Sequence, residues 1–269
     1  MRIEKNRRIE NRMDTIRMVV AESGHAFLDQ NWRYHKMCSP FSRLYYVKEG
    51  EGILELPHRR VLLQAGYAYL IPAGLEYDYR CENHMEKWYF HVNIPMPDGF
   101  DLFQGSRDCY EKPCQKGELE RVAKWYDRDS LEASFALYGL LTETMAAMIQ
   151  AAGLAEKEMR IYSPMVQAFF SRAGEMISSA LRVGDLAQEL NISPSTLAKR
   201  FKKETGMAVG AYLDQMLFNQ ACQLLLTTDL TVCQISDQLD FCDQFYFSRY
   251  FKRHQGETPT DYRKRMRGI

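Results

Sequence analysis

The chain has 269 residues, a length that suits two ordinary domains or one large one. Its 46% hydrophobic and 26% charged residues are typical of a globular protein and argue against a disordered one. No apolar run approaches the roughly 18–20 residues of a membrane helix, and the polar segment 1–5 argues against a secretory signal. The seven scattered cysteines include no Cys-x-x-Cys pair, which predicts reduced thiols in a cytoplasmic protein. The formal net charge is zero, so an acidic partner would have to be recognised by local charge clusters.

The first third of the chain is expected to form short strands. Aromatic and β-branched residues dominate five segments, 45–47, 53–56, 61–63, 67–71 and 88–92. Turn-forming residues separate them, at 49–52, 57–58, 65–66 and 72–74. Many short strands at close spacing predict an antiparallel barrel or sandwich.

From Gly117 onward the apolar residues recur at helical spacing. A longer stretch, from Ser130 to Ala152, carries an apolar stripe formed by Leu131, Phe135, Tyr138, Leu141, Met145 and Met148. Such a stripe suits either packing on the barrel or the interface of a homodimer, and the pattern leaves both open. Residues 153–163 are predicted to be a linker.

After Pro164 the pattern is helical and contains an internal repeat. The segment 193–202 recurs fifty residues later as 243–252, with apolar and basic residues in matching places. Gly206 recurs in the same way as Gly256. A long amphipathic helix, predicted from about Val209 to Leu226, joins the two copies.

Each copy has the layout of a helix-turn-helix unit. In the first copy a short helix over 183–190 precedes a tight turn. Ser193 is then a good N-cap, and Pro194 suits the first helical position because its missing N–H costs nothing there. The next helix would bury Leu197 and Phe201 and expose a basic, hydroxyl-rich face.

The second copy follows the same plan, with Asp243 as N-cap and Phe247 and Phe251 as apolar spine. Basic side chains on such helices neutralise phosphates, and Ser, Thr, Gln and Arg reach base edges in the major groove. We therefore predict that ten side chains contact double-stranded promoter DNA: Ser195, Thr196, Lys199, Arg200, Lys203, Gln244, Phe245, Ser248, Arg249 and Lys252.

These repeats resemble the AraC/XylS family of transcription regulators. The similarity runs from about Val166 to Arg267 and includes Ser193-Pro194-Ser195-x-Leu197, Phe241-x-Asp243-Gln244-x-Tyr246-Phe247-Ser248-Arg249 and Gly256-x-Thr258-Pro259. The resemblance implies that one chain places two reading helices in successive major grooves on one face of DNA. Three positions depart from the residues usual in the family: Ser236 replaces Ala, Asp240 replaces Gly, and Leu217 replaces Arg. Asp tolerates the left-handed backbone of a turn, whereas the lost Arg removes a structural or phosphate contact.

The strand-rich region resembles the cupin-like sensor domain found in many members of this family. The similarity rests on Tyr46-Val47-x-x-Gly50-x-Gly52, then Gly66, Pro72-x-Gly74 and Tyr77. Metal-dependent cupins carry His and Glu ligands at positions that correspond here to Lys36, Cys38, Arg43 and Tyr77. Because an arginine repels a metal cation, we expect no metal, no cofactor and no catalytic residue in this region.

The cupin resemblance and the alternation of strand residues suggest which side chains face the barrel interior. On the segment 88–92, either Trp88 and Phe90 or Tyr89 and His91 would face inward. The expected ligand-binding residues are Arg33, which would cover the mouth of the barrel, and Arg43, Tyr45, Tyr77, Tyr79, Trp88 and His91. Aromatic residues with one or two arginines suit a small polar or anionic ligand such as a sugar or a carboxylate. The same aromatics would equally fill a small barrel that binds nothing.

Together these patterns predict an α+β protein: an N-terminal cupin-like antiparallel β-barrel with appended helices and a C-terminal all-α domain with two helix-turn-helix motifs. The expected parts are a ligand-sensing barrel over 1–110, a helical dimerisation segment and linker over 111–160, and a tandem helix-turn-helix DNA-binding domain over 161–269. We expect a non-enzymatic, homodimeric regulator whose barrel senses a small-molecule effector and controls promoter binding or activation. RNA polymerase is a further expected partner, and a membrane is not.

Two alternatives remain at this stage. One is a cupin-type enzyme fused to a DNA-binding domain, which a tightly bound metal would favour. The other is a ligand-independent DNA-binding protein whose barrel only dimerises.

Overall fold

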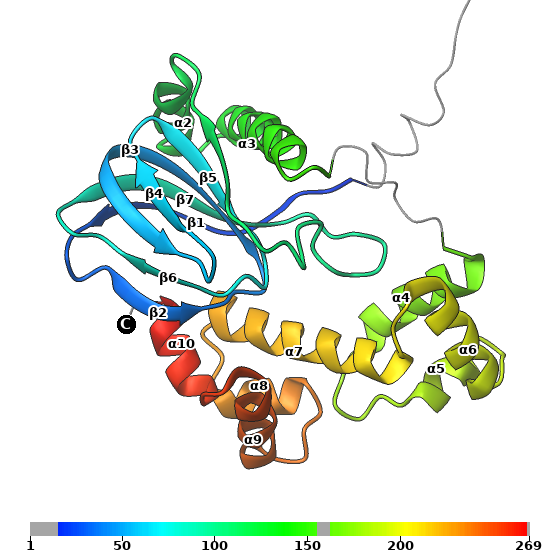
Figure 1. Ribbon diagram of the computed structural model, residues 1–269. Coiled ribbons are helices and arrows are strands. Elements are labelled where there is room, and N and C mark those ends of the chain that lie inside the picture. Colours follow the sequence, from blue (N-terminus) through cyan, green and yellow to red (C-terminus); the bar gives the residue numbers. More distant parts are fainter. Residues whose placement is uncertain (1–15, 155–161, 268–269) are drawn as a thin grey trace, which may run out of the picture. The chain divides into compact units, whose positions relative to one another are not determined.

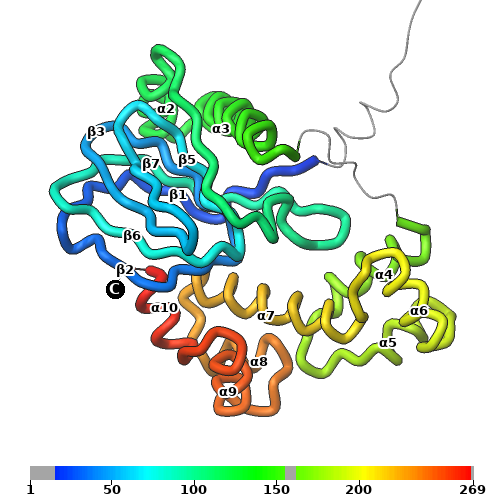
Figure 2. Tube along the Cα trace, viewed as in Figure 1, coloured from blue at the N-terminus to red at the C-terminus, as the bar shows by residue number. Residues whose placement is uncertain are grey.

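The computed structural model describes residues 16–154 and 162–267, which form two compact units (Figure 1). The first unit contains the strands and two helices. Apart from residues 97–99, the second unit contains only the helical part of the chain from residue 162 onward. The trace in Figure 2 shows this segregation of strands and helices along the chain. The predicted α+β class is therefore confirmed. No described helix is both long and apolar enough to span a membrane.

The first unit is an antiparallel barrel in which one long strand, β3, belongs to two sheets. In one sheet the strand order is β1-β7-β3-β5-β8; in the other, β3 pairs with β4 and β6, and β6 pairs with β2. The strands are β1 Val19–Leu28, β2 Arg33–Met37, β3 Ser42–Glu55, β4 Arg60–Gln64, β5 Tyr67–Ile71, β6 Tyr77–Arg80, β7 Met85–Asn93 and β8 Tyr110–Pro113.

β3 joins two segments that were predicted as separate strands, and the turn predicted between them at 49–52 is wrong. The chain instead forms a bulge, because the pairing of β3 with β7 shifts register between Val47 and Glu49. Gly50 has a φ of +70°, and a Cβ there would lie 2.1 Å from the carbonyl oxygen of His84. Only glycine fits such a position. The bulge bends β3 and lets it pass from one sheet into the other.

Four strands, β1, β2, β6 and β8, were not predicted, because their sequences show little apolar alternation. β1, for example, includes polar residues and Gly24, and most of its side chains are partly or fully exposed. These strands are held by backbone pairing with neighbours that are buried. The boundary predicted between residues 110 and 111 falls inside β8, which pairs with β5.

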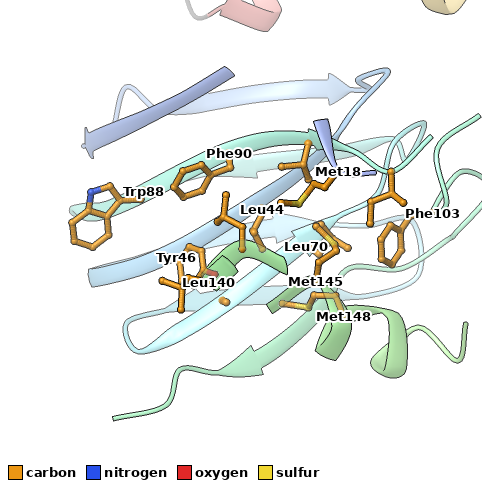
Figure 3. Packing of buried hydrophobic residues seen from close by; sticks show 14 of the residues in the cluster. Met18, Leu44, Tyr46, Leu70, Trp88, Phe90, Phe103, Leu140, Met145 and Met148 are labelled. Atoms are coloured by element: carbon orange, nitrogen blue, oxygen red, sulfur yellow. The ribbon is translucent and has the colours of Figure 1, made fainter. Parts of the chain in front are cut away.

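Two helices, α2 Glu118–Tyr126 and α3 Leu131–Ala151, cover one face of the barrel (Figure 1). Figure 3 shows the core between them and the sheet, where Tyr46, Trp88 and Phe90 lie on the same side as Leu140 and Met145. Burial of this many apolar side chains supplies the main favourable term for this packing.

The apolar stripe predicted on α3 divides into two halves. Leu141, Met145 and Met148 are buried in the core against the sheet. Leu131 and Phe135, in contrast, are 75% and 72% exposed. The predicted packing on the barrel is therefore correct only for the C-terminal half of the helix.

The second unit consists of helices that form two similar halves around a central helix. Their bounds are α4 Pro164–Met176, α5 Val183–Glu189, α6 Pro194–Thr205, α7 Val209–Thr227, α8 Val232–Gln238, α9 Gln244–Gln255 and α10 Pro259–Arg267. Phe201 of α6 packs against Phe169 and Tyr212 in the first half, and Phe251 of α9 packs against Phe218 and Tyr262 in the second. The central helix α7 thus contributes a ring to each core, at Tyr212 and Phe218.

Candidate functional site

In the first helix-turn-helix unit, α5 packs on α6 through a tight turn. Asn191 in this turn has a φ of +52°, a conformation that Asn adopts more readily than most residues. Ser193 is the N-cap of α6, as predicted, and its Oγ accepts a hydrogen bond of 3.2 Å from the backbone N–H of Thr196. Gly206 ends the helix in the left-handed conformation.

The outer face of α6 carries the predicted contact residues. Leu197 and Phe201 are fully buried, which turns the opposite face of the helix to solvent. All five predicted side chains on this helix are exposed: Ser195, Thr196, Lys199, Arg200 and Lys203. None of the three cations among them forms an ion pair with a described residue. Their charge is therefore available to a partner.

The second unit repeats this geometry in α8 and α9. Asp240 in its turn has a φ of +54°, so aspartate does take the left-handed conformation where the family usually has glycine. Asp243 caps α9 by accepting a 2.6 Å hydrogen bond from the backbone N–H of Tyr246. That bond holds the pKa of the Asp243 carboxyl below its usual value. Phe247 and Phe251 are fully buried.

The outer face of α9 carries the other five predicted residues: Gln244, Phe245, Ser248, Arg249 and Lys252. Four of them are exposed, and Ser248 is half-buried, with its hydroxyl donating to the backbone carbonyl of Gln244 at 2.7 Å. Arg249 and Lys252 have no carboxylate partner in the described part of the chain. The two outer faces together form a pair of unneutralised basic surfaces.

The basic side chains of α10 have a different role. Arg263 Nε donates to the backbone carbonyl of Leu225 at 2.9 Å, and Arg267 Nε donates to that of Leu226 at 3.2 Å. Arg265 forms an ion pair with Glu257. Arg263 and Arg267 thus satisfy carbonyls at the C-terminal end of α7 and stabilise that helix end.

A second cluster of polar side chains lies inside the barrel. The pairing of β3 with β5 and β7 places Arg43 opposite Ile71 and His91, and Tyr45 opposite Tyr69 and Tyr89. Because paired residues share a face of the sheet, Tyr89 and His91 point to the same side as Arg43. Of the two orientations left open for this strand, the structure therefore has Tyr89 and His91 inward.

Trp88 was among the expected ligand-binding residues, and that prediction is wrong. Its side chain lies on the opposite face of β7, in the core against α2 and α3, together with Phe90 and Tyr46 (Figure 3). It also stacks on His25 of β1, with the ring centroids 4.6 Å apart. Both faces of β7 are buried, so burial does not distinguish the inner from the outer face.

Arg43 is only 4% exposed and lies beside the phenol rings of Tyr45, Tyr77 and Tyr79. Its Nε donates a long hydrogen bond of 3.4 Å to Ser39 Oγ. Its Nη2 is buried without a hydrogen-bond partner among the described atoms, and so is the hydroxyl of Tyr77. Burial raises the pKa of Tyr77 well above its usual value, so this phenol stays protonated.

Lys87 is a second cation on the inner face, and it was not predicted. It is 3% exposed, and its Nζ lies 3.2 Å from the ring centroid of Tyr45 and 4.3 Å from that of Trp32. Aromatic faces attract a cation in this way. Burial lowers the pKa of Lys87, and the nearby charge of Arg43 lowers it further.

His91 is also buried, and its Nδ1 is hydrogen-bonded to Glu22 Oε2 at 2.9 Å. The hydroxyl of Tyr89 donates to the other oxygen of Glu22 at 3.2 Å. Burial lowers the pKa of His91 to about 4, although the bond to Glu22 opposes this shift. The imidazole is therefore neutral at pH 7.

Arg33 was expected to cover the mouth of the barrel, but the structure does not place it there. It is exposed and pairs with Arg80 across β2 and β6, on the face opposite Tyr34 and Tyr79. The covering residue is instead Trp32, which stacks on Tyr79 with ring centroids 4.1 Å apart. The described residues contain no group of three or more His, Cys, Asp or Glu side chains placed to hold a metal.

The chain is similar to known proteins in both of its units. A family model described as a helix-turn-helix domain matches residues 186–265, which include both copies of the repeat. The Msm operon regulatory protein of Streptococcus mutans is 26% identical over 238 residues, which are 83% of this chain and 84% of that protein. The raffinose operon transcriptional regulatory protein RafR of Pediococcus pentosaceus is 25% identical over 82% of this chain and 84% of its own length. Residues 186–265 therefore match a helix-turn-helix domain, and most of the chain is similar to operon regulatory proteins.

The fold of the chain is also found in a solved structure. ToxT of Vibrio cholerae, determined with a bound unsaturated fatty acid, superposes with a TM-score of 0.56. The match covers 92% of this chain and 96% of that one at 14% sequence identity. The likeness therefore concerns the arrangement of a barrel followed by tandem helix-turn-helix units.

The structure shows the surroundings of two residues, Leu217 and Ser236, that differ from those usual in the AraC/XylS family. Leu217, where the family usually has Arg, is buried in the helical unit, so an apolar contact replaces a polar one. Ser236, where the family has Ala, is also buried, and its Oγ has no partner among the described atoms.

Proposed function

We propose that this regulator reads promoter DNA through the outer faces of α6 and α9. The observation that carries the proposal is the pair of exposed basic helices, each fixed by an N-cap, whose cations lack carboxylate partners in the described chain. The helix between them, α7, has 19 residues and spans about 28 Å at 1.5 Å per residue. This is close to the ~34 Å between successive major grooves.

The DNA fragment for the test comes from footprinting the purified protein on the region upstream of its own gene. Replacing both Lys199 and Arg249 by alanine should weaken binding to the protected fragment by about 30-fold or more. Each base-reading or phosphate contact is worth ~1–3 kcal/mol, so the two losses together amount to ~2–6 kcal/mol. Fluorescence anisotropy at several salt concentrations measures the loss and should also show a shallower salt dependence.

The matched control replaces Arg172 and Lys264 by alanine. These are an exposed arginine and an exposed lysine of the same unit that lie outside α6 and α9. The control removes the same formal charge and should change affinity little. If both double variants lost the same DNA affinity, the effect would arise from net charge alone. The assignment of α6 and α9 as the reading helices would then be rejected.

We propose further that the barrel senses a small molecule and that the protein regulates without catalysing a reaction. A sugar and a carboxylate are both candidates. The names of relatives favour a sugar, because RafR is a raffinose operon regulator. The fatty acid bound to ToxT, a neighbour in fold only, is an example of a carboxylate. The expected outcome of effector binding is a change in promoter occupancy or activation, with RNA polymerase as the partner on DNA.

A homodimer is the third part of the proposal. The N-terminal half of α3 carries Leu131, Phe135 and Tyr138, all of them exposed. Large apolar side chains that share a helix face and lack cover are typical of interaction surfaces. A second copy of the chain is the proposed occupant of this face.

A further inference from the structure

The barrel interior holds more positive than negative charge. Arg43 and Lys87 are both nearly inaccessible to solvent, and neither forms an ion pair with a described residue. Glu22 is a carboxylate that interacts electrostatically with Arg43, but its side chain is 45% exposed and is hydrogen-bonded to His91 and Tyr89. A buried cation without a counter-ion is costly unless something else compensates it.

The buried carboxylates of this unit do not supply the missing charge. Asp101 accepts hydrogen bonds from the hydroxyl of Ser42 and from two backbone N–H groups. Glu118, at the start of α2, forms an ion pair of 2.8 Å with Lys112 and accepts a hydrogen bond from the hydroxyl of Thr144 in α3. Both carboxylates are therefore engaged on the side of the sheet away from Arg43.

Two neighbouring residues of the barrel interior, Arg43 and Tyr77, each bury a donor that lacks a partner among the described atoms. These donors are Arg43 Nη2 and the hydroxyl of Tyr77. Buried polar atoms in native proteins are nearly always satisfied, by protein, water or ligand. A guanidinium presents two parallel N–H groups that match the oxygens of a carboxylate or phosphate. A neutral ligand would satisfy the hydrogen bonds but leave the charge uncompensated.

We infer that the inner face of the barrel binds a small ligand through an anionic oxygen group, held by Arg43 and Tyr77 with Lys87 as the second cation. The ring of Trp32, which lies over Lys87 and is half-buried, covers this group from the edge of the barrel. This inference rests on the proposed sensing function and narrows its ligand to a carboxylate or a phosphate ester. A neutral sugar is excluded by it.

The test uses the full chain and the smallest matched probes, acetate and its neutral counterpart acetamide, with inorganic phosphate as a third. Saturation-transfer NMR and the melting temperature of the barrel report binding, at ionic strength held constant with sodium chloride. Acetate, phosphate or both should bind and raise the melting temperature, while acetamide should do neither. The preferred probe identifies the carboxylate or the phosphate class.

Arg43→Gln should weaken binding of the preferred anion by about 10- to 100-fold, as expected for the loss of a charge-assisted hydrogen bond. Arg33→Gln is the matched control, because Arg33 is an exposed arginine on the outer face of the neighbouring strand β2. Should Arg43→Gln fail to fold, Lys87→Met is the second variant and should also weaken anion binding. It removes the charge and keeps the long apolar stem.

Three results would overturn the inference: acetamide binding as tightly as the anions, no binding of either anion, or an equal loss in Arg33→Gln. The same preparation is tested on the footprinted DNA fragment. DNA binding without anion binding would reject only the ligand class. If the same protein did not bind the DNA fragment by means of α6 and α9, the proposed function itself would be rejected.

Discussion

Ser236 lies on α8 at a position with no exposed surface, and its hydroxyl has no hydrogen-bond partner among the described residues. Burying an unsatisfied hydroxyl costs ~1–3 kcal/mol relative to leaving it in water. We therefore expect Ser236→Ala to raise the free energy of unfolding of the helical unit by about 1 kcal/mol, since alanine also has the higher helix propensity. Urea unfolding followed by circular dichroism measures this change.

The control for that experiment is Ser195→Ala, a serine on an exposed helix face in the same unit. It should change stability much less, because an exposed hydroxyl is hydrated in both states. A destabilised Ser236→Ala variant would mean that the hydroxyl has a partner, such as a bound water, and that its removal opens a cavity.

The sequence predicted the structural position of some single residues correctly and missed that of others. Ser193, Asp243, Leu197 and Phe247 were placed correctly, because N-caps and the apolar spine of a helix are local signals. Lys87 was missed for a physical reason. Lysine is rarely buried, so a lysine in a strand is normally assigned to solvent, and only the surrounding rings explain its position here.

For strand β7, the sequence could not predict which side chains face the barrel interior. Trp88 and Phe90 are buried against the helices, and His91 and Lys87 are buried in the barrel. A strand that is covered on both faces has no polar side to reveal its orientation. Only the pairing of Arg43 with His91 settles which side chains face inward.

Among the elements, the helices that begin at an N-cap depend on a small number of bonds. The Oγ of Ser193 accepts from the backbone N–H of Thr196, which would otherwise lack a partner in the first turn of α6. Ser193→Ala should lower the free energy of unfolding of the helical unit by about 1 kcal/mol. It should also weaken DNA binding, because the first turn of α6 carries two of the proposed contact residues, Ser195 and Thr196.

Ser193→Asn provides the rescue, since asparagine caps a helix about as well as serine. Thermal unfolding should place this variant close to the wild type, and DNA affinity should recover with it. If alanine and asparagine caused the same loss, the effect would arise from a contact of the serine itself and not from capping.

Prediction at the level of elements was better for helices than for strands. The predicted linker helix and the two helix-turn-helix units agree with α5 to α9 because their start and stop signals lie within the sequence of each helix. β3 was instead divided in two, because Gly50 and Gly52 are typical of a turn and the bulge depends on a distant partner. That partner, the His84 carbonyl, lies on the segment before β7 and is not visible from β3 alone.

For the whole molecule, α3 offers the surface on which two copies would meet. Phe135 is 72% exposed near the middle of the proposed interface. A charge placed there would lose its hydration on dimerisation, which is costly without a counter-ion. Phe135→Asp should therefore shift the protein from dimer to monomer in sedimentation velocity at micromolar concentration.

The barrel itself should remain folded in that variant, because the side chain of Phe135 is not part of the buried core. Phe27→Asp is the matched control: Phe27 is 74% exposed, belongs to the same unit, and lies on β1 away from α3. Since two linked copies bind adjacent DNA sites with higher avidity than one, Phe135→Asp should weaken binding to a paired site and leave a single site unaffected. A wild-type protein that sediments as a monomer, or a dimer that Phe27→Asp disrupts equally, would show that the exposed half of α3 is not the interface.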